Sequence, residues 1–279
     1  MKYMCILALL CITELKAQIN LTFNKRFVES EDKWVAFKPD KDSSYPFGFI
    51  YIDAQAGLTL NFEGSFKILS DGRFVAKKSD NTNTKIRLEP NNVLVAFIPE
   101  NKFQELQISL IPDWLTYYKT DTNSVERLYR WGYMYNGWGE CAKALSFLEK
   151  AKTINSKHKG LMVELSYSYN CLEQYDKAEM LLDEEIKINP GDSYTNKEFI
   201  YTLTKNNKIA KATIQFEALL TTVKDKQYHA ENCYNILQYY YKQKDKENFA
   251  KWYKILQLQP NLSKMIIQYS DNMKRELEK

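Results

Sequence analysis

Apolar and polar residues alternate with a period of two across residues 27–110, a pattern typical of half-buried antiparallel strands. The alternation is clearest over residues 58–68. One face of this stretch carries Leu58, Leu60, Phe62, Phe66 and Ile68, and the other carries Thr59, Asn61, Glu63, Ser65 and Lys67. Gly64 stands in the middle and predicts a bulge or bend. Asp71-Gly72 then predicts a hairpin turn, since glycine accepts a positive φ.

Further short strands are predicted on both sides of this one, separated by loops rich in Pro, Asp, Asn and Ser. They are Lys33–Phe37, Phe47–Ile52, Lys85–Glu89, Val93–Ile98 and Phe103–Ile108. About seven short strands in so little chain favour a small sandwich or a partly open barrel. We therefore expect an antiparallel β domain over residues 18–110.

A polar and aromatic segment, residues 111–124, follows the β pattern. Pro112 ends the last strand, because proline cannot donate to a sheet ladder. Trp114, Tyr117 and Tyr118 are expected to join the β domain to the helical part of the chain. A platform on which a ligand stacks is the alternative interpretation of this aromatic linker.

From Val125 onward the period changes to that of helices, and the pattern repeats every 34 residues. Tyr135 and Tyr169 are 34 residues apart, and so are Ala144 and Ala178. The expected helices fall at about 125–135, 140–154, 160–172, 175–188, 194–204, 209–223, 228–242, 246–258 and 263–278. Paired helices at this period, with small residues at the helix contacts and Pro190 after the second pair, resemble tetratricopeptide repeats.

The resemblance covers residues 125–260 and implies four units, 125–158, 159–192, 193–226 and 227–260. The last helix, within residues 261–279, is apolar on one side and polar on the other, as the end of a helical array requires. A helix that binds a membrane surface or a partner is the alternative. The expected fold class is α+β, with a β domain followed by a solenoid of three to four helix pairs and a capping helix.

By this resemblance, the first helices of the units line a groove that holds a peptide or protein partner. Tyr133, Tyr167 and Tyr201 recur at intervals of 34 residues in a position that faces the groove in tetratricopeptide proteins. Asn136 and Asn170 recur one turn further along. We expect these five residues to bind the partner, because tyrosine offers a large contact area at low entropic cost. The alternative is that the tyrosines only cover the inner helices or pack on the β domain.

The N-terminus reads as a targeting segment. Lys2 precedes the apolar run Met4–Ile12, and Ala17 is a small residue at a plausible cleavage position. The ending Leu15–Gln18 resembles signal peptides of Bacteroidetes-type bacteria. A signal peptide over residues 1–17 predicts a periplasmic or secreted protein. A buried N-terminal helix is the alternative. The apolar run is too short for a membrane span. A lipoprotein signal requires a small residue before its cysteine, and Leu10 before Cys11 departs from that pattern.

Cysteine and histidine offer little chemistry. Cys141, Cys171 and Cys233 follow the signal segment without CxxC spacing. The favoured interpretation is that they are small hydrophobic residues packed in the core. Cys141 and Cys171 fall near expected helix ends, so a disulfide between them stays open. The only two histidines, His158 and His229, are not close in sequence to two cysteines. We expect no metal and no cofactor.

Charge and motifs narrow the function further. The net charge of +4 is spread along the chain, so it lacks the clustered basic face of a nucleic-acid-binding protein. No GxSxG, HExxH, Walker or GxGxxG motif occurs. The sequence predicts a non-enzymatic scaffold or adaptor in the bacterial cell envelope. A carbohydrate- or small-ligand-binding β domain with an oligomerising helical arm is the alternative, and a hydrolase with its site between the domains is a weaker one.

Overall fold

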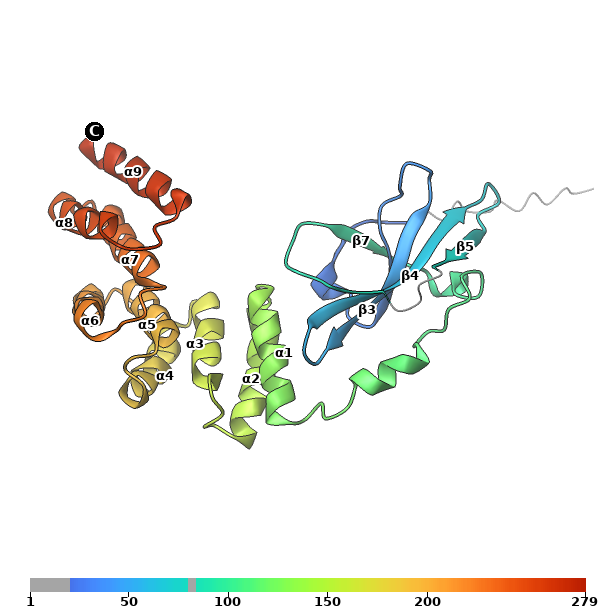
Figure 1. Cartoon of the computed structure of the whole chain (residues 1–279), viewed down its shortest axis with the longest axis horizontal. Coiled ribbons are helices and arrows are strands. Elements are labelled where there is room, and N and C mark those ends of the chain that lie inside the picture. Colours follow the sequence, from blue (N-terminus) through green and yellow to red (C-terminus); the bar gives the residue numbers. More distant parts are fainter. Residues whose placement is uncertain (1–20, 80–83) are drawn as a thin grey trace, which may run out of the picture. The chain divides into compact units, whose positions relative to one another are not determined.

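The computed structural model describes residues 21–79 and 84–279, and it separates into two compact units, 1–120 and 121–279 (Figure 1). The first unit is an antiparallel β domain and the second is a row of helices, so the expected α+β layout is confirmed. The predicted signal peptide, residues 1–17, lies outside the described residues.

The β unit is built on one seven-stranded sheet in which every pair of neighbouring strands is antiparallel. The strand order is β1-β7-β2-β3-β4-β5, and β6 pairs with β4 as well. The strands are β1 (Lys25–Arg26), β2 (Lys33–Ala36), β3 (Tyr45–Asp53), β4 (Gly57–Ile68), β5 (Phe74–Lys78), β6 (Lys85–Arg87) and β7 (Leu94–Phe97). The long strands β3 and β4 therefore form the middle of the sheet.

The bulge predicted at Gly64 is confirmed. Phe47 pairs with Gly64 but the next residue, Gly48, pairs with Phe62, so the register shifts at this point. Gly64 has a φ of +147°, and a Cβ there would lie 2.4 Å from the carbonyl oxygen of Lys77. Glycine is therefore required here for both its conformation and its size.

The prediction of a polar outer face on β4 is wrong for its first half. Thr59 and Asn61 are 3% and 4% exposed, nearly as buried as Leu58 and Leu60. In this part β4 is an inner strand, with Thr59 and Asn61 paired to β3 on one edge and to β6 on the other. The Thr59 hydroxyl is satisfied locally, by donating to the carbonyl oxygen of Gly57 at 3.0 Å.

Aromatic side chains fill the core of the β unit. Trp34 meets Phe49 edge to face with ring centroids 5.1 Å apart, and Phe66 stacks on Phe74 at 4.7 Å. The indole N–H of Trp34 donates to the carbonyl oxygen of Ser109 at 2.8 Å, so its polar edge is also satisfied.

The strand predicted over Phe103–Ile108 is wrong. Pro99 precedes a short 3-10 helix, Glu100–Lys102, and turns follow. The segment is held by its side chains: Leu106 is fully buried, and the Glu105 carboxylate accepts from the backbone N–H of Phe74 at 2.5 Å. The alternation of apolar residues came from a turn that packs on the core, not from a strand.

The aromatic linker packs on the β unit. Its 3-10 helix, Asp113–Tyr118, brings the Trp114 ring to 5.0 Å and the Tyr118 ring to 4.6 Å from Tyr51. Tyr117 points elsewhere and is 80% exposed. Trp114 and Tyr118 thus close the aromatic core of the sheet.

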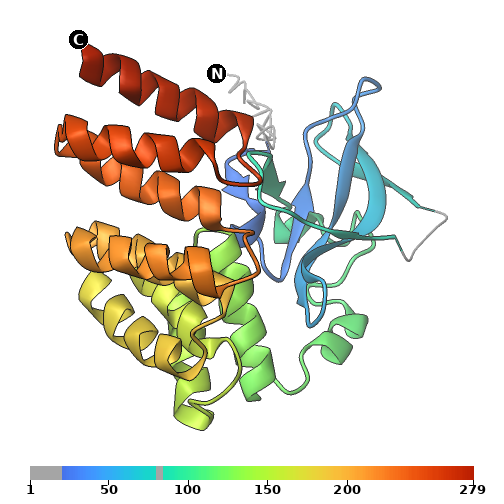
Figure 2. The same ribbon diagram turned by 60° about the vertical axis from the view of Figure 1, so that its left-hand side comes forward.

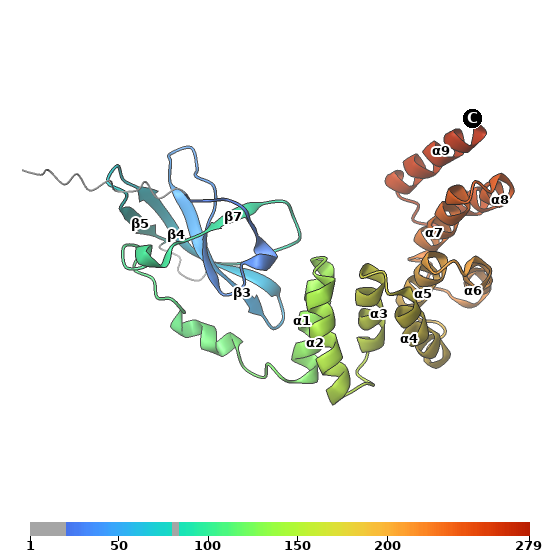
Figure 3. The same cartoon turned by 180° about the vertical axis from the view of Figure 1, so that it is seen from behind.

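The second unit consists of helices that follow one another in pairs (Figures 1 and 3). They are α1 (Val125–Gly137), α2 (Cys141–Ile154), α3 (Leu161–Cys171), α4 (Tyr175–Ile188), α5 (Ser193–Lys205), α6 (Ile209–Thr222), α7 (His229–Lys242), α8 (Lys246–Gln257) and α9 (Lys264–Glu278). These bounds agree closely with the helices expected from the sequence.

The helices form two rows, seen stacked in Figure 2. We call α1, α3, α5 and α7 the A row and α2, α4, α6 and α8 the B row. Each A-row helix contacts its B-row partner and the next A-row helix, and α9 packs on α7 and α8. Contacts made mainly between neighbouring helices are typical of solenoids.

Small residues set the spacing between the rows. Ala144, Ala178 and Ala212 recur every 34 residues and are fully buried. Gly132 of α1 lies against α2, where an added Cβ would come within 2.3 Å of Leu148 Cγ. Close helix packing therefore explains the small residues of the repeat pattern.

The terminal helix α9 begins at the predicted cap, since Ser263 accepts from the N–H of Ile266 at 3.2 Å. The Tyr253 hydroxyl donates to Asp271 at 2.5 Å, which ties α9 to α8. The apolar face predicted for α9 is only partly covered, because Met265 and Tyr269 remain 62% and 50% exposed.

Candidate partner-binding face

The three tyrosines singled out by spacing occupy equivalent positions on α1, α3 and α5 of the A row. Tyr133 is 60% exposed, while Tyr167 and Tyr201 are half-buried. The Lys205 ammonium lies 5.2 Å from the centre of the Tyr201 ring. A role for these tyrosines in binding stays a prediction.

Burial raises the pKa of Tyr167 and of Tyr201, and nearby Glu198 raises both further. Both phenols are therefore protonated at neutral pH. Each can donate one hydrogen bond and accept others, as recognition of a peptide backbone requires.

The two predicted asparagines lie inside the row, not at its surface. Asn136 and Asn170 are 2% and 4% exposed. The Asn136 amide donates to the Glu164 carboxylate at 2.9 Å and to the Glu164 carbonyl oxygen at 3.0 Å, and its own oxygen accepts from the Ser168 hydroxyl at 2.7 Å. Their amides thus link neighbouring A-row helices, and any part in binding stays a prediction.

Two of these three bonds recur one repeat later. The Asn170 amide donates to the Glu198 carboxylate at 3.2 Å and accepts from the Thr202 hydroxyl at 3.0 Å. We call these two sets of bonds the asparagine ladder. Sequence reasoning missed its other members, although Glu164 and Glu198, like Ser168 and Thr202, are 34 residues apart.

The ladder ends at the junction of α5 and α7. Thr204 stands in the asparagine position, and its hydroxyl donates within its own helix to the carbonyl oxygen of Tyr201 at 2.7 Å. Asn232 stands in the glutamate position, and its side-chain oxygen has no hydrogen-bond partner among residues 21–79 and 84–279.

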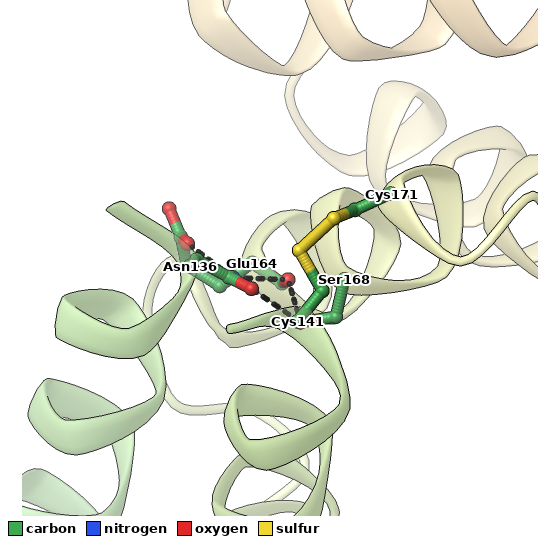
Figure 4. Close-up of a disulfide and its surroundings, with 5 residues drawn as sticks. All are labelled: Asn136, Cys141, Glu164, Ser168 and Cys171. Atoms are coloured by element: carbon green, nitrogen blue, oxygen red, sulfur yellow. Dashed lines mark hydrogen bonds between the residues drawn. A yellow bond between two sulfur atoms is a disulfide. The ribbon is translucent and has the colours of Figure 1, made fainter. Parts of the chain in front are cut away.

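Cys141 and Cys171 form a disulfide, so the favoured interpretation of both as free packed hydrophobes is wrong (Figure 4). The bond joins the first residue of α2 to the last residue of α3, with the two Cα atoms 6.2 Å apart. The repeat geometry brings these helix ends together, which spacing along the chain does not reveal. Cys233, by contrast, is a buried free thiol that donates to the carbonyl oxygen of Trp252 at 3.6 Å, and burial raises its pKa.

The carboxyl of Glu164 titrates abnormally. Burial raises its pKa from 4.5 to about 7; the hydrogen bond from Asn136 opposes this, and the charge of Glu198 adds to it. The Tyr194 hydroxyl stands 3.5 Å from its second oxygen. No ammonium or guanidinium lies within 4 Å of this carboxyl among the described residues.

The equivalent carboxylate, Glu198, does hold a cation. The Lys197 ammonium lies 2.9 Å from Glu198 and 3.7 Å from Glu231. It also lies 5.0 Å and 5.6 Å from the ring centres of Tyr194 and Tyr228. Burial lowers the pKa of Lys197, but Glu198, Glu231 and Tyr228 together raise it more, so the ammonium stays charged.

The B row presents an ionic network of its own. Glu179 of α4 accepts from Asn206 and Lys208 at 2.8 Å each, and Asp183 accepts from Lys211 at 2.8 Å. The lysines Lys187 and Lys211 hold the pKa of Asp183 at about 2. These contacts join the second unit of the array to the third.

Neither metal chemistry nor membrane spanning has support in the described residues. No three His, Cys, Asp or Glu side chains of residues 21–79 and 84–279 gather closely enough to hold a metal ion. Over the same residues, every helix is too short or too polar to cross a bilayer.

No family model matches the sequence, and no curated protein matches it significantly. Solved structures with similar coordinates include YrrB, described as a tetratricopeptide repeat protein with an unusual peptide-binding site, at 21% identity and a TM-score of 0.45, covering 55% of this chain and 76% of that one. A tetratricopeptide repeat protein from Parabacteroides merdae ATCC 43184 has 17% identity and a TM-score of 0.44 over 64% of this chain and 63% of its own. MamA MSR-1 has 18% identity and a TM-score of 0.41 over 58% and 82%.

The fold rests on this chain's own geometry. Its helix pairs repeat every 34 residues, make their main contacts with neighbouring helices and pack through recurring alanines. The helices therefore form a tetratricopeptide-like array, as the sequence predicts.

Proposed function

We propose that the protein is a non-enzymatic scaffold of the bacterial cell envelope that binds an extended segment of a partner protein on its A row. The observation that carries this proposal is the recurrence of Tyr133, Tyr167 and Tyr201 at one position of three successive helices. An extended chain laid across the row would meet one of these tyrosines on each helix.

The chemistry of the row suits a peptide. Tyrosine rings give apolar contact area with few rotatable bonds, and their neutral hydroxyls can pair with backbone groups. Tyr133 is the most accessible of the three, and Tyr167 and Tyr201 keep part of their surface open. A side chain of the partner could pack between them without displacing the ladder beneath.

The location in the envelope is supported by two observations. The sequence opens with a segment of the signal-peptide type, and the disulfide between Cys141 and Cys171 is of the kind that persists in oxidising compartments. A periplasmic or secreted location therefore belongs to the proposal.

Crosslinking in the native host followed by mass spectrometry tests the proposal. Replacing Tyr133, Tyr167 and Tyr201 together by alanine should remove the crosslinked partners. The control replaces three exposed apolar residues of the B row, Met180, Ile188 and Ile214, which are 62%, 78% and 68% exposed. If both triple variants fold and retain the same partners as the unchanged protein, the A row is not the binding surface.

A further inference from the structure

Two carboxylates of the A row occupy equivalent positions and differ in whether a cation is paired with them. Glu164 and Glu198 are 34 residues apart, each accepts from a ladder asparagine, and both are 3% exposed. Glu198 holds the Lys197 ammonium at 2.9 Å. At the position equivalent to Lys197, beside Glu164, the chain has Val163.

The aromatic walls around the two carboxylates also correspond. The Lys197 ammonium lies 5.0 Å from the ring centre of Tyr194, on its own helix, and 5.6 Å from that of Tyr228, the residue before α7. The two rings contact each other, with their centroids 6.0 Å apart. Beside Glu164, Tyr194 takes the place of Tyr228, 34 residues earlier, and its hydroxyl reaches the carboxyl at 3.5 Å.

The second wall comes from a different helix. Gly160 stands where the repeat would place a tyrosine equivalent to Tyr194, and the space is used by Tyr129 of α1. A Cβ on Gly160 would lie 2.7 Å from the Tyr129 hydroxyl oxygen. Burial raises the pKa of the Tyr129 hydroxyl to about 12, and the nearby charge of Glu164 is the second cause of this rise.

The charges of the surrounding helices leave this place electronegative. Glu164, Glu198 and Glu231 face Lys197 from α3, α5 and α7, and Lys197 is already paired with two of them. Glu164 accepts hydrogen bonds from Asn136 and Tyr194, and the charge of Lys197 acts on it, but no cation is within ion-pair distance of it among the described residues. A positive group beside Glu164 would supply that partner, and a buried carboxylate needs one to stay charged. Tyrosine faces add attraction for a cation.

We propose that Glu164, Tyr129 and Tyr194 form a cation site that receives a lysine or arginine side chain of the segment bound on the A row. The site is the one that Lys197 fills within the chain one repeat later, so Lys197 is an internal stand-in for the ligand group. The incoming cation takes the place of the Tyr194 hydroxyl at the Glu164 oxygen. This inference rests on the proposed function, since the basic residue belongs to the bound segment.

Selection from a library of random peptides on the full chain, followed by affinity measurement on the best binders, tests the site. The peptides should share a lysine or arginine at one position. Replacing that residue by glutamine should weaken binding to the unchanged protein by about tenfold, as expected for a close charge pair. On the Glu164→Gln variant the same change in the peptide should have little effect, because the partner charge is absent.

Glu231→Gln is the matched control. It removes one carboxylate of the same row, but Glu231 is paired with Lys197 at 3.7 Å, so the peptide's basic residue should keep its full effect. Val163→Lys supplies a cation from the chain itself and should abolish the preference for basic peptides. Circular dichroism shows whether that variant folds, and if it does not, the comparison of Glu164→Gln with Glu231→Gln decides.

The possible failures are distinct. If no peptide is selected, or if selected peptides bind the Tyr133/Tyr167/Tyr201 alanine variant equally well, the proposed function fails and this inference with it. If peptides bind through those tyrosines but lack a common basic residue, or if Glu164→Gln and Glu231→Gln behave alike, the cation site alone is overturned.

Discussion

The side-chain amide of Asn136 donates to the carboxylate of Glu164 across the junction of α1 and α3, at 2.9 Å, and Asn170 repeats this contact toward Glu198. Asn136→Ala would leave the Glu164 carboxyl and the Ser168 hydroxyl without their shared partner in a buried place. We expect a loss of about 1–3 kcal/mol in the free energy of unfolding. Denaturant unfolding measures it, with the exposed Asn189→Ala as a control that should change little. Equal stability of the two variants would contradict the structural role of the ladder.

The raised pKa of Glu164 makes stability depend on pH. An acid whose pKa rises from 4.5 to about 7 on folding binds more protons when folded, so its contribution is complete below pH 4.5 and is lost as the pH rises through 7. The shift corresponds to an effect on the order of 3 kcal/mol. Glu164→Gln should therefore unfold at a higher temperature than the unchanged protein at pH 8, and the difference should shrink by pH 5. Parallel melting curves for Glu231→Gln serve as the control, and a constant difference across this range would rule out the pKa shift.

The disulfide should contribute strongly to the stability of the array. Cys141 and Cys171 are separated by 30 residues, and closing a loop of that size is worth about 3–4 kcal/mol in the chain-entropy model. Reduction with a thiol should lower the midpoint of denaturant unfolding by a corresponding amount. The same treatment of a Cys141→Ser/Cys171→Ser variant should have no effect, and a drop there would assign the change to Cys233 instead.

Two glycines of α1 should respond in opposite directions to alanine. At Gly132 the added Cβ would meet Leu148 at 2.3 Å, whereas at Gly137 it would meet nothing within 4 Å. Gly132→Ala is expected to lose about 1–3 kcal/mol through overpacking, and Gly137→Ala to be neutral or to gain up to about 1 kcal/mol from helix propensity. Thermal unfolding of the pair is the measurement. A tolerated Gly132→Ala would mean that α1 and α2 can separate without cost.

The helices were predicted well from the sequence because the same pattern of residues recurs in successive repeat units. Ala144 and Ala178 mark the same contact twice, so one ambiguous segment does not mislead the whole assignment. The β domain offers no such redundancy. Phe103–Ile108 has the alternation of a strand, but the anchoring of Leu106 and Glu105 by distant residues makes it a turn.

The candidate site was predicted only in part. Spacing located Tyr133, Tyr167 and Tyr201, but it could not tell a surface position from a buried one, and it assigned the ladder asparagines to the surface. Burial of a side chain depends on which residues of the next helix pack on it, and at Asn136 one of these is Ser168, whose hydroxyl donates to its side-chain oxygen. The disulfide was missed for the same reason, since only the packed array brings Cys141 to Cys171.

The disulfide between α2 and α3 makes the N-terminal end of the array more stable than its C-terminal end. Both the disulfide and the first set of ladder bonds lie at the N-terminal junction, while the ladder is absent where α5 meets α7. In a row whose helices contact only neighbours, opening proceeds from the weakest end. Thermal unfolding would therefore begin with α9 and α8 and stop at the disulfide-linked helices α2 and α3. The remaining helices would then refold by packing on this part of the array.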